Sequence, residues 1–528
     1  MNEQSFRKRA RTTLVDRSLP ASARASGLVM LLALSAAGCG DAGSASAKGM
    51  NVLLVTLDTT RADHLSCYGY KTETTPNIDA LAADGVRFGR AISTAGITPM
   101  SHSSILTGLN NYEHGMRVFY SDEVSHRLKE SVETMPEILG AGGWQTAAMV
   151  SSYPVSEIYG LDQGFDTFST GLDLEGHDFS KQQQHETAWL DGQGNATQRR
   201  GDYTVDEALR WLDDTGDDPW CLWVHMFDVH DYSVVPPAAF MKPFGLEYDK
   251  DASLQDPEWR VRMYDPELSF MDMQVGRLLG WVKEHGQWDD TIVVVTADHG
   301  QGLMDGFRRH QWQKHRLLYD WCIHVPLILR IPGEASATVV ENQVRTIDIL
   351  PTLLEALSLP SPRVEGMSML DLMRGGTEDE PRLAYADALN LVDDHSPHGK
   401  LPPDCQDNLF CVTDGRWKMI WHQEKPRRSQ LFDLLNDPGE TINVAKEHPN
   451  RMKRWKEFLD ERQAMVFEPP SDDLAAPNDA MLRALGYVGD EEDEEDEENG
   501  ENEENEENEE NEENEENEEN GDGKAEDR

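Results

Sequence analysis

Three continuous apolar runs constrain the fold of this chain more than any other feature of its sequence. They are NVLLVTL (51–57), WCLWVHMF (220–227) and TIVVVT (291–296). Apolar runs without polar alternation are typical of central strands that are buried on both faces of a parallel sheet. Patterns with helical spacing lie between them, at 77–85, 133–143 and 265–284. Strands that alternate with helices predict an α/β fold, with a mostly parallel central sheet and helices on both faces.

The N-terminal residues 1–39 have the composition of an export signal. Basic residues come first, then a short apolar stretch (27–37), and then small residues that end at Cys39. This order is typical of a secretory signal peptide, and Ala-Ala-Gly-Cys before a polar linker (40–49) is similar to a bacterial lipobox. We therefore expect an exported protein, anchored in the cell envelope (periplasm or outer membrane) by lipid on Cys39. Plain secretion is the alternative.

The C-terminal residues 490–528 form a Glu/Asn repeat. They hold 25 acidic residues against Lys524 and Arg528, and so carry −23 of the formal net charge of −49. Such a segment buries no apolar surface and repels itself, so we expect it to be disordered. The rest of the chain is also acidic, which argues against a nucleic-acid partner.

The stretch between these ends is long enough for one large and one small domain. After about residue 375 the sequence becomes loop-rich, with strand-like stretches at 414–422 and 431–440. We expect a catalytic domain over 50–375 and a smaller C-terminal subdomain with an antiparallel sheet over 376–489.

The cysteines occur at 39, 67, 221, 322, 405 and 411, and no pair has the spacing of a metal knuckle. Cys405 and Cys411 flank a short loop. In an oxidising compartment these two residues are expected to form a disulfide.

Acidic residues follow two of the three apolar runs. Asp58 comes directly after 51–57, and Asp298 with His299 follows 291–296 after one alanine. Ligands of open parallel sheets bind beyond the carboxyl ends of the strands. Two carboxylates and an imidazole there suit a divalent cation. Helix capping or ion pairing is the alternative for such acids.

Four stretches, in order, resemble the sulfatase family of the alkaline phosphatase superfamily. They are LDTTRADHLSCYGY with TTPNIDALAADGVRF (57–70, 74–88), TPMSHSSILTG with EHG (98–108, 113–115), FDVHDY (227–232), and VVTADHGQGL with KHRLLYDWCIHVPLILRIPG (294–303, 314–333). TIDILPTLL (346–354) and LFDLLNDPGE (431–440) extend the resemblance to about residue 445. It implies an alkaline phosphatase-like fold and a metal-dependent hydrolase of sulfuric or phosphoric esters.

The resemblance implies that Asp58, Asp298 and His299 bind a divalent metal. The family often has a second acid directly after the first, but Thr59 occupies that position here. Because this ligand set has fewer carboxylates and one nitrogen, the metal remains open among Ca, Mg, Mn and Zn.

The second stretch departs from the family at the nucleophile. Most sulfatases have Cys-x-Pro-x-Arg before Leu-Thr-Gly, and the cysteine or serine is oxidised to formylglycine. The register from Leu-Thr-Gly at 106–108 places Thr98 at the nucleophile and His102 at the arginine position. Threonine does not undergo that oxidation, but it is the nucleophile of related phosphodiesterases, so we expect a metal-activated Thr98 hydroxyl. Thr98 as the N-cap of a helix over 98–108 is the alternative reading, and Ser101 is the second candidate.

Further residues are assigned by the resemblance. His230 stands where the family has a substrate-contacting histidine, and Lys314 or His315 where it has a basic residue over the ester oxygens. Asp228 would serve a second metal if the chain is closer to two-metal phosphodiesterases. The family's Gly-Lys-Trp-His-Leu-Gly stretch is missing, and Ser-Ser-Tyr (151–153) follows instead.

The sequence thus predicts a sulfatase-like hydrolase that acts on a sulfate or phosphate ester of a small molecule or glycan. Two other readings stay open. One is a phosphodiesterase, phosphonate hydrolase or phosphoryl-group transferase of the same superfamily. The other is a degenerate binding protein that keeps the fold, motivated by the missing formylglycine cysteine and the missing lysine–histidine stretch.

Overall fold

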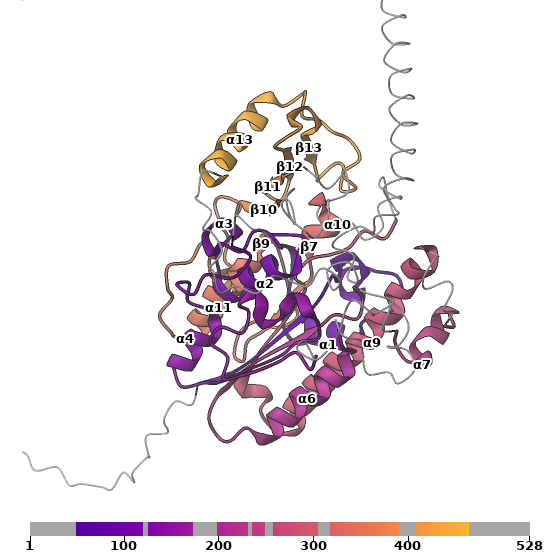
Figure 1. Cartoon of the computed structure of the whole chain (residues 1–528), viewed down its shortest axis with the longest axis vertical. Helices are drawn as coiled ribbons and strands as arrows, with labels where there is room; N and C mark the ends of the chain where they lie inside the picture. The colour runs from indigo at the N-terminus through magenta and orange to yellow at the C-terminus, as the bar shows by residue number, and fades with distance from the viewer. Residues whose placement is uncertain are drawn as a thin grey trace, which may run out of the picture. The chain divides into compact units, whose positions relative to one another are not determined.

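The computed structural model describes residues 49–119, 125–172, 198–230, 235–248, 257–304, 317–389 and 407–463. All of these residues belong to one compact unit, Lys48–Arg528 (Figure 1). The predicted signal segment, the acidic tail, Lys314, His315 and Cys405 lie outside the described residues. Within the described part of the chain, no helix combines the length and the apolar character that a membrane span requires.

The three apolar runs form the centre of a nine-stranded sheet. They are β1 (Asn51–Leu57), β5 (Trp220–Met226) and β6 (Thr291–Thr296), which lie parallel with β1 in the middle. All their residues are buried. The predicted α/β fold with a mostly parallel sheet is therefore confirmed.

The outer strands make the sheet mixed. They are β2 (Val86–Ile92), β3 (Gln145–Met149), β4 (Thr167–Ser169), β7 (His324–Val325), β8 (Leu327–Arg330) and β9 (Thr338–Arg345). On one side β3 and β4 continue the parallel arrangement beyond β5. On the other side β8 runs antiparallel to β6 and to β2, and β2 pairs with β7 and β9.

Helices cover both faces of this sheet (Figure 1). The side chains of β1 alternate, so that Val52 and Leu54 join one apolar cluster and Leu53, Val55 and Leu57 the other. The first cluster includes α2 (Thr98–Thr107), α4 (Met135–Ala141) and α11 (Ile349–Ala356). The second includes α1 (Pro76–Asp84), α6 (Gly201–Asp214) and α9 (Pro257–Glu284).

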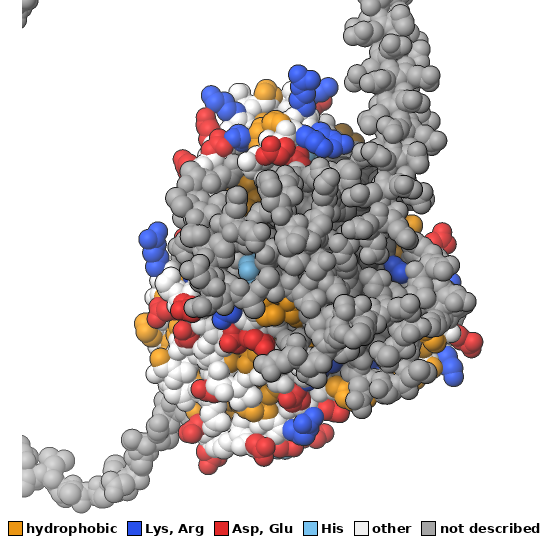
Figure 2. All heavy atoms as spheres, viewed as in Figure 1, with side chains coloured by type: hydrophobic (Ala, Val, Ile, Leu, Met, Phe, Trp, Pro, Cys, Tyr) orange, Lys and Arg blue, Asp and Glu red, His pale blue; other side chains and the backbone are white. Residues whose placement is uncertain are grey.

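A second sheet follows in the C-terminal part of the chain. Its strands are β10 (Ala384–Ala388), β11 (Leu409–Thr413), β12 (Trp417–His422) and β13 (Gln430–Asp433), all antiparallel. Helix α13 (Pro449–Gln463) covers one face. Around α13, Figure 2 shows basic and acidic side chains interspersed. The predicted small antiparallel sheet is confirmed, while the domain limits at 375 and 489 stay predictions.

The expected disulfide between Cys405 and Cys411 is wrong. Cys411 lies in the middle of β11 and has a free thiol that is completely buried. Its side chain packs in an apolar cluster between the two sheets, with Ile92 and Cys322 among its members.

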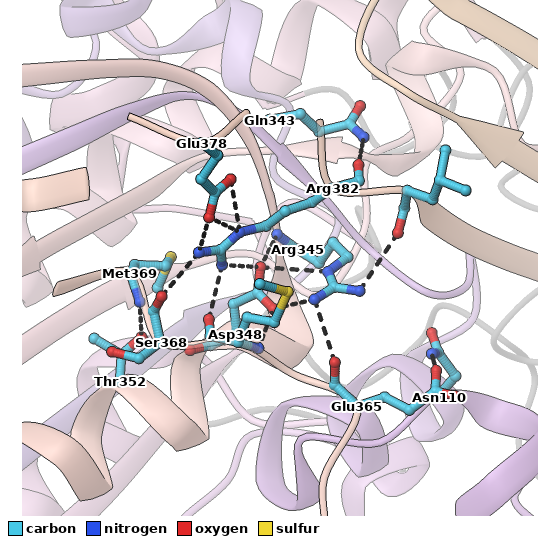
Figure 3. Close-up of polar contacts among 12 residues, drawn as sticks. Asn110, Gln343, Arg345, Asp348, Thr352, Glu365, Ser368, Met369, Glu378 and Arg382 are labelled. Carbon is cyan, nitrogen blue, oxygen red and sulfur yellow. Dashed lines mark hydrogen bonds and ion pairs between the residues drawn. The ribbon is translucent and has the colours of Figure 1, made fainter. Parts of the chain in front are cut away.

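A group of charged residues, which we call the arginine network (Arg345, Asp348, Glu378 and Arg382), joins the two sheets (Figure 3). Asp348 and Arg382 are buried, while Arg345 and Glu378 are half-buried. The Asp348 carboxylate accepts from Arg345 Nη2 at 2.7 Å and from Arg382 Nη1 at 2.8 Å. Arg382 also donates to Glu378, and its carbonyl accepts from the Gln343 amide at 2.7 Å. Each charge in this network has an opposite partner, which offsets the cost of burial.

Candidate active site

Asp58, Asp298 and His299 meet at the carboxyl ends of β1 and β6, as the strand pattern predicts. One ligand atom from each lies within 4.8 Å of the others. All three side chains are fully buried. The Asp58 N–H donates to the Met226 carbonyl at 2.9 Å and so continues the ladder between β1 and β5. We call these three residues the acidic cluster; among the described residues it is the one group of this kind with three members.

The backbone after Asp58 is strained. Thr59 has a φ of 49°, a left-handed conformation that is rare for a β-branched residue. Its N–H donates to Asp298 Oδ1 at 3.2 Å, and its carbonyl accepts from the Tyr264 hydroxyl at 2.8 Å. These two hydrogen bonds hold the strained turn in place, and the one to Asp298 links the ends of β1 and β6.

The tautomer of His299 follows from its neighbours. Nδ1 lies 2.9 Å from the Gly300 carbonyl, which only accepts, so Nδ1 carries the proton. The Nε2 lone pair then faces the acidic cluster, 3.3 Å from Asp298 Oδ2 and 3.2 Å from Thr98 Oγ1. The nitrogen that faces the carboxylates is the one suited to bind a cation.

These residues fit a divalent metal ion. Burial, and then the nearby Asp298 carboxylate, raise the pKa of Asp58 well above its ordinary value. Asp58 Oδ1 is buried and has no hydrogen-bond partner among the described residues. An orphaned carboxylate oxygen beside a second acid is costly to bury, and a cation between them would relieve that cost. Two oxygens and one nitrogen suit Mg, Mn, Ca or Zn.

Thr98 lies at the first helical position of α2, directly beside the acidic cluster. The N-cap is Ile97, and Pro99 occupies the first turn, where proline fits. The reading of Thr98 as a helix N-cap is therefore wrong. Its Oγ1 lies 3.2 Å from His299 Nε2. Ser101, the second candidate, bonds the Thr98 carbonyl at 3.0 Å and lies 3.3 Å from Asp298 Oδ2.

Helix α2 is polar in sequence, yet all its residues are buried. Its hydroxyls are satisfied mainly inside the helix, because Ser103 donates to the Pro99 carbonyl and Thr107 to the Ser103 carbonyl, both at 2.7 Å. The helix ends at Gly108, whose φ of 68° forms the left-handed cap. The N-terminus of this buried helix is thus firmly placed at the cluster.

His102, predicted at the arginine position, lies behind Thr98. Its Nδ1 donates to the Thr98 carbonyl at 2.8 Å, and its Nε2 lies 3.1 Å from Thr56 Oγ1. Thr56 Oγ1 in turn accepts from Trp223 Nε1 at 2.9 Å, so its own proton is directed to His102. Burial lowers the pKa of His102 to about 3, which keeps the ring neutral. Both nitrogens are engaged inside the protein.

His225 contacts the acidic cluster, and the sequence reasoning missed it. Its Nε2 lies 3.1 Å from Asp58 Oδ2, and its Nδ1 accepts from the Ser151 N–H at 3.3 Å. Burial lowers the pKa of His225 to about 3. The available signal was a polar residue inside the apolar run 220–227.

The remaining predicted residues are placed differently. The His230 ring is buried and stacks on Phe227, with ring centres 4.2 Å apart. Asp228 Oδ1 accepts from the Gly201 N–H at 2.9 Å at the start of α6, so this carboxylate lies outside the acidic cluster. Burial raises the pKa of Asp228 to about 7. Lys314 and His315 lie outside the described residues.

Two known protein families match parts of this chain. Residues 50–359 match the family described as Sulfatase. The chain belongs to the sulfatase family. Residues 308–464 match the family described as N-sulphoglucosamine sulphohydrolase, C-terminal, which spans the second sheet. The protein is thus a hydrolase of the sulfatase family.

Its curated relatives are distant. N-acetylglucosamine-6-O-sulfatase of Bacteroides thetaiotaomicron is 24% identical, with 84% of this chain and 92% of the relative covered. An arylsulfatase of Clostridium perfringens is also 24% identical, with 78% and 93% covered.

Solved structures with similarly low sequence identity share the fold. Phosphonate monoester hydrolase of Agrobacterium radiobacter has a TM-score of 0.60 and 23% identity, covering 79% of this chain and 95% of its own. A structure in complex with its substrate D-glucosamine-2-N,6-O-disulfate has a TM-score of 0.60 and 22% identity, covering 79% and 98%. These likenesses establish the fold.

Proposed function

We propose that this sulfatase-family hydrolase cleaves a sulfate or phosphate ester by direct attack of the unmodified Thr98 hydroxyl. The proposal rests mainly on the position of Thr98 at the start of α2, where its Oγ1 lies 3.2 Å from His299 Nε2. Asp58, Asp298 and His299 would hold one divalent metal. Bound there, the metal would lower the pKa of the Thr98 hydroxyl and offset charge on the transferring group.

The roles of the protein groups follow from their contacts. The Thr98 hydroxyl gives its proton to water, and its oxygen attacks sulfur or phosphorus in line while the bond to the leaving alcohol oxygen breaks. The N–H groups at the start of α2 bind the remaining ester oxygens. His102 holds the Thr98 carbonyl and so orients the nucleophile. His230 is proposed as the acid that protonates the leaving alcohol, and Lys314 or His315 as the cation over the ester oxygens.

The substrate class follows from the chemistry of the adduct. A formylglycine hydrate releases sulfate by elimination, using its second hydroxyl. Thr98 has one hydroxyl, so water must hydrolyse its covalent ester. Hydrolysis at phosphorus clears such an adduct more readily, which favours phosphate or phosphonate esters. The relative named N-acetylglucosamine-6-O-sulfatase supports a sulfated glycan as the second candidate.

Variants of two threonines on one helix test the nucleophile. Thr98→Ala should lower kcat by about a thousandfold or more while the protein stays folded, and Thr98→Ser should keep part of the activity. Thr107→Ala removes an equivalent hydroxyl at the other end of α2 and should remain active. Normal turnover by Thr98→Ala would sink the proposal and make Ser101 the next candidate.

A substrate panel then separates the classes. Aryl sulfate, aryl phosphate, a phosphodiester and a phosphonate are each offered with Mg²⁺, Mn²⁺, Ca²⁺ or Zn²⁺. After a quench, mass spectrometry of peptide 98–108 should show an added phosphoryl or sulfuryl group and no oxidation at Thr98. A phosphoryl acceptor that raises turnover would indicate a transferase, and binding without any turnover would indicate the degenerate binding protein.

We also propose that the protein is exported and acylated at Cys39. The proposal rests on the basic, apolar and small-residue order of 1–39. Labelled fatty acid should enter the wild type and be absent from Cys39→Ala, which should leave the membrane fraction. One acyl chain anchors a protein only marginally, so a multi-chain modification is expected. Unlabelled, soluble wild type would indicate plain secretion.

A further inference from the structure

We propose that His225 is a positioning residue, which holds Asp58 by its Oδ2 oxygen and leaves the Oδ1 oxygen for the metal. The inference rests on the proposed metal site. It is carried by two contacts of one buried ring, from the Ser151 N–H to Nδ1 at 3.3 Å and from Nε2 to Asp58 Oδ2 at 3.1 Å.

The fold fixes the place of His225. In the parallel register of β1 and β5, His225 lies opposite Thr56. Asp58 stands two residues beyond Thr56 and extends the same ladder through its N–H to the Met226 carbonyl. Residues two apart in a strand share a face, so the Asp58 and His225 side chains point to the same side of the sheet. The Ser151 hydroxyl also donates to the His225 carbonyl at 2.7 Å.

The hydrogen bonds allow one tautomer. The Ser151 N–H can only donate, so His225 Nδ1 accepts and carries no proton. The proton of the neutral ring is then on Nε2, where it is donated to Asp58 Oδ2. A carboxylate oxygen that accepts this bond has a fixed orientation. Asp58 Oδ1, which has no hydrogen-bond partner among the described residues, remains for the cation.

A neutral donor suits this position. His225 is not a member of the acidic cluster, so it acts on the metal through Asp58. A lysine or arginine there would add a positive charge beside the cation and weaken its binding. Partners of this kind, one bond behind a ligand, typically change metal affinity by about 10- to 100-fold.

Two substitutions separate the ring's two contacts. Gln places an amide N–H near the position of Nε2 and can still donate to Asp58, but it loses the acceptor for Ser151. Asn places its amide oxygen near the position of Nδ1 and can still accept from Ser151, but it does not reach Asp58. Both replace the ring with a smaller neutral amide.

The experiment titrates Mn²⁺, and in parallel Ca²⁺, into metal-free full-length chain by calorimetry. We expect His225→Asn to weaken binding by about 10- to 100-fold and His225→Gln to stay nearer the wild type. Asp58→Asn measures the metal that the acidic tail takes up without the site. His324→Asn is the matched control, because His324 is a histidine that bonds the Gly89 carbonyl at 3.1 Å away from the acidic cluster.

The outcomes are distinct. Wild-type affinity in His225→Asn, or equal weakening in Asn and Gln, would overturn the inference. If His225→Asn does not fold, His225→Gln decides. A loss of metal affinity as large as in Asp58→Asn would overturn the inference, and tight metal binding would support it. Wild-type affinity in Asp58→Asn would instead refute the proposed metal site, whatever His225 does.

Discussion

Two polar regions of this protein, each built around buried carboxylates, differ in how their charges are compensated. The arginine network sets Arg345 and Arg382 against Asp348 and Glu378, with contacts of 2.7 to 2.8 Å. The acidic cluster sets Asp58 beside Asp298, and two neighbouring histidines, His102 and His225, are kept neutral because burial lowers their pKa values to about 3. The first region is balanced by the chain itself. In the acidic cluster, no lysine or arginine among the described residues offsets the charge of the two carboxylates.

The two regions serve different purposes: the arginine network contributes to stability, and the acidic cluster contributes to function. A balanced network contributes to the joint between the two sheets and needs nothing from outside. An unbalanced cluster costs stability, and that cost becomes binding energy when a cation arrives. The neutral histidines are consistent with this division, because they orient Asp58 and Thr98 without supplying the missing charge. Variants in each region should therefore fail in different measurements.

The largest effect is expected for Asp298→Ala. Loss of one of three proposed ligands should abolish turnover and also remove the rise in Tm that metal gives to the wild type. A ligand at 100 times its Kd stabilises the folded state by about 2.7 kcal/mol, and this gain should disappear. Differential scanning calorimetry with and without metal measures it. A variant with normal metal content and turnover would exclude Asp298 as a ligand.

The second prediction concerns a variant that removes one charge from the arginine network. Arg382→Met keeps most of the side-chain volume but leaves Asp348 and Glu378 with less compensation, so the free energy of unfolding should fall by about 3–5 kcal/mol. Metal affinity should not change. Arg374→Met is the matched control, because Arg374 pairs with Glu334 at the surface and should change stability little. Urea unfolding of both variants measures this difference. Equal losses in the free energy of unfolding would contradict the prediction.

The third effect is pH-dependent and concerns Asp228. Burial raises its pKa from 3.8 to about 7 in the folded state, so the folded protein binds this proton more tightly than the unfolded chain. Stability from this group is present at low pH and is lost as pH rises from about 4 to about 7. Asp228→Asn keeps an acceptor for the Gly201 N–H, and should gain roughly 2–4 kcal/mol over the wild type between pH 4 and pH 8. Urea unfolding at both values measures it, and a difference that does not change with pH would contradict the assignment.

The sequence predicted the parts of the fold and site that depend on local pattern. The strands Asn51–Leu57 and Thr291–Thr296 have the predicted bounds. Their acidic ends meet because parallel strands end at one edge of the sheet. Helix α9 begins eight residues earlier than predicted, at Pro257, since its first turns pack Trp259 and Met263 in a small separate cluster that helical spacing from 265 onward does not indicate.

The sequence did not predict features that depend on the order of the strands within the sheet. His225 stands in an apolar run, and its contact with Asp58 exists only because β5 is the neighbour of β1. Periodicity does not tell which strands are adjacent. The disulfide prediction failed for a related reason, since closeness in sequence does not indicate that Cys411 points into the cluster between the sheets.

The smallest effect is expected for Thr56→Val, which tests the chain of hydrogen bonds behind the nucleophile. The Thr56 hydroxyl accepts from Trp223 Nε1 and donates to His102 Nε2, and valine keeps its shape without that hydroxyl. Two buried polar atoms lose a partner, so the free energy of unfolding should fall by about 1–3 kcal/mol. His102 Nδ1 still donates to the Thr98 carbonyl, so kcat should stay close to the wild type. Urea unfolding and steady-state kinetics separate the two quantities. A large fall in kcat at unchanged stability would mean that Thr56 fixes the ring of His102, and that the neutral histidines depend on their own partners to orient Thr98.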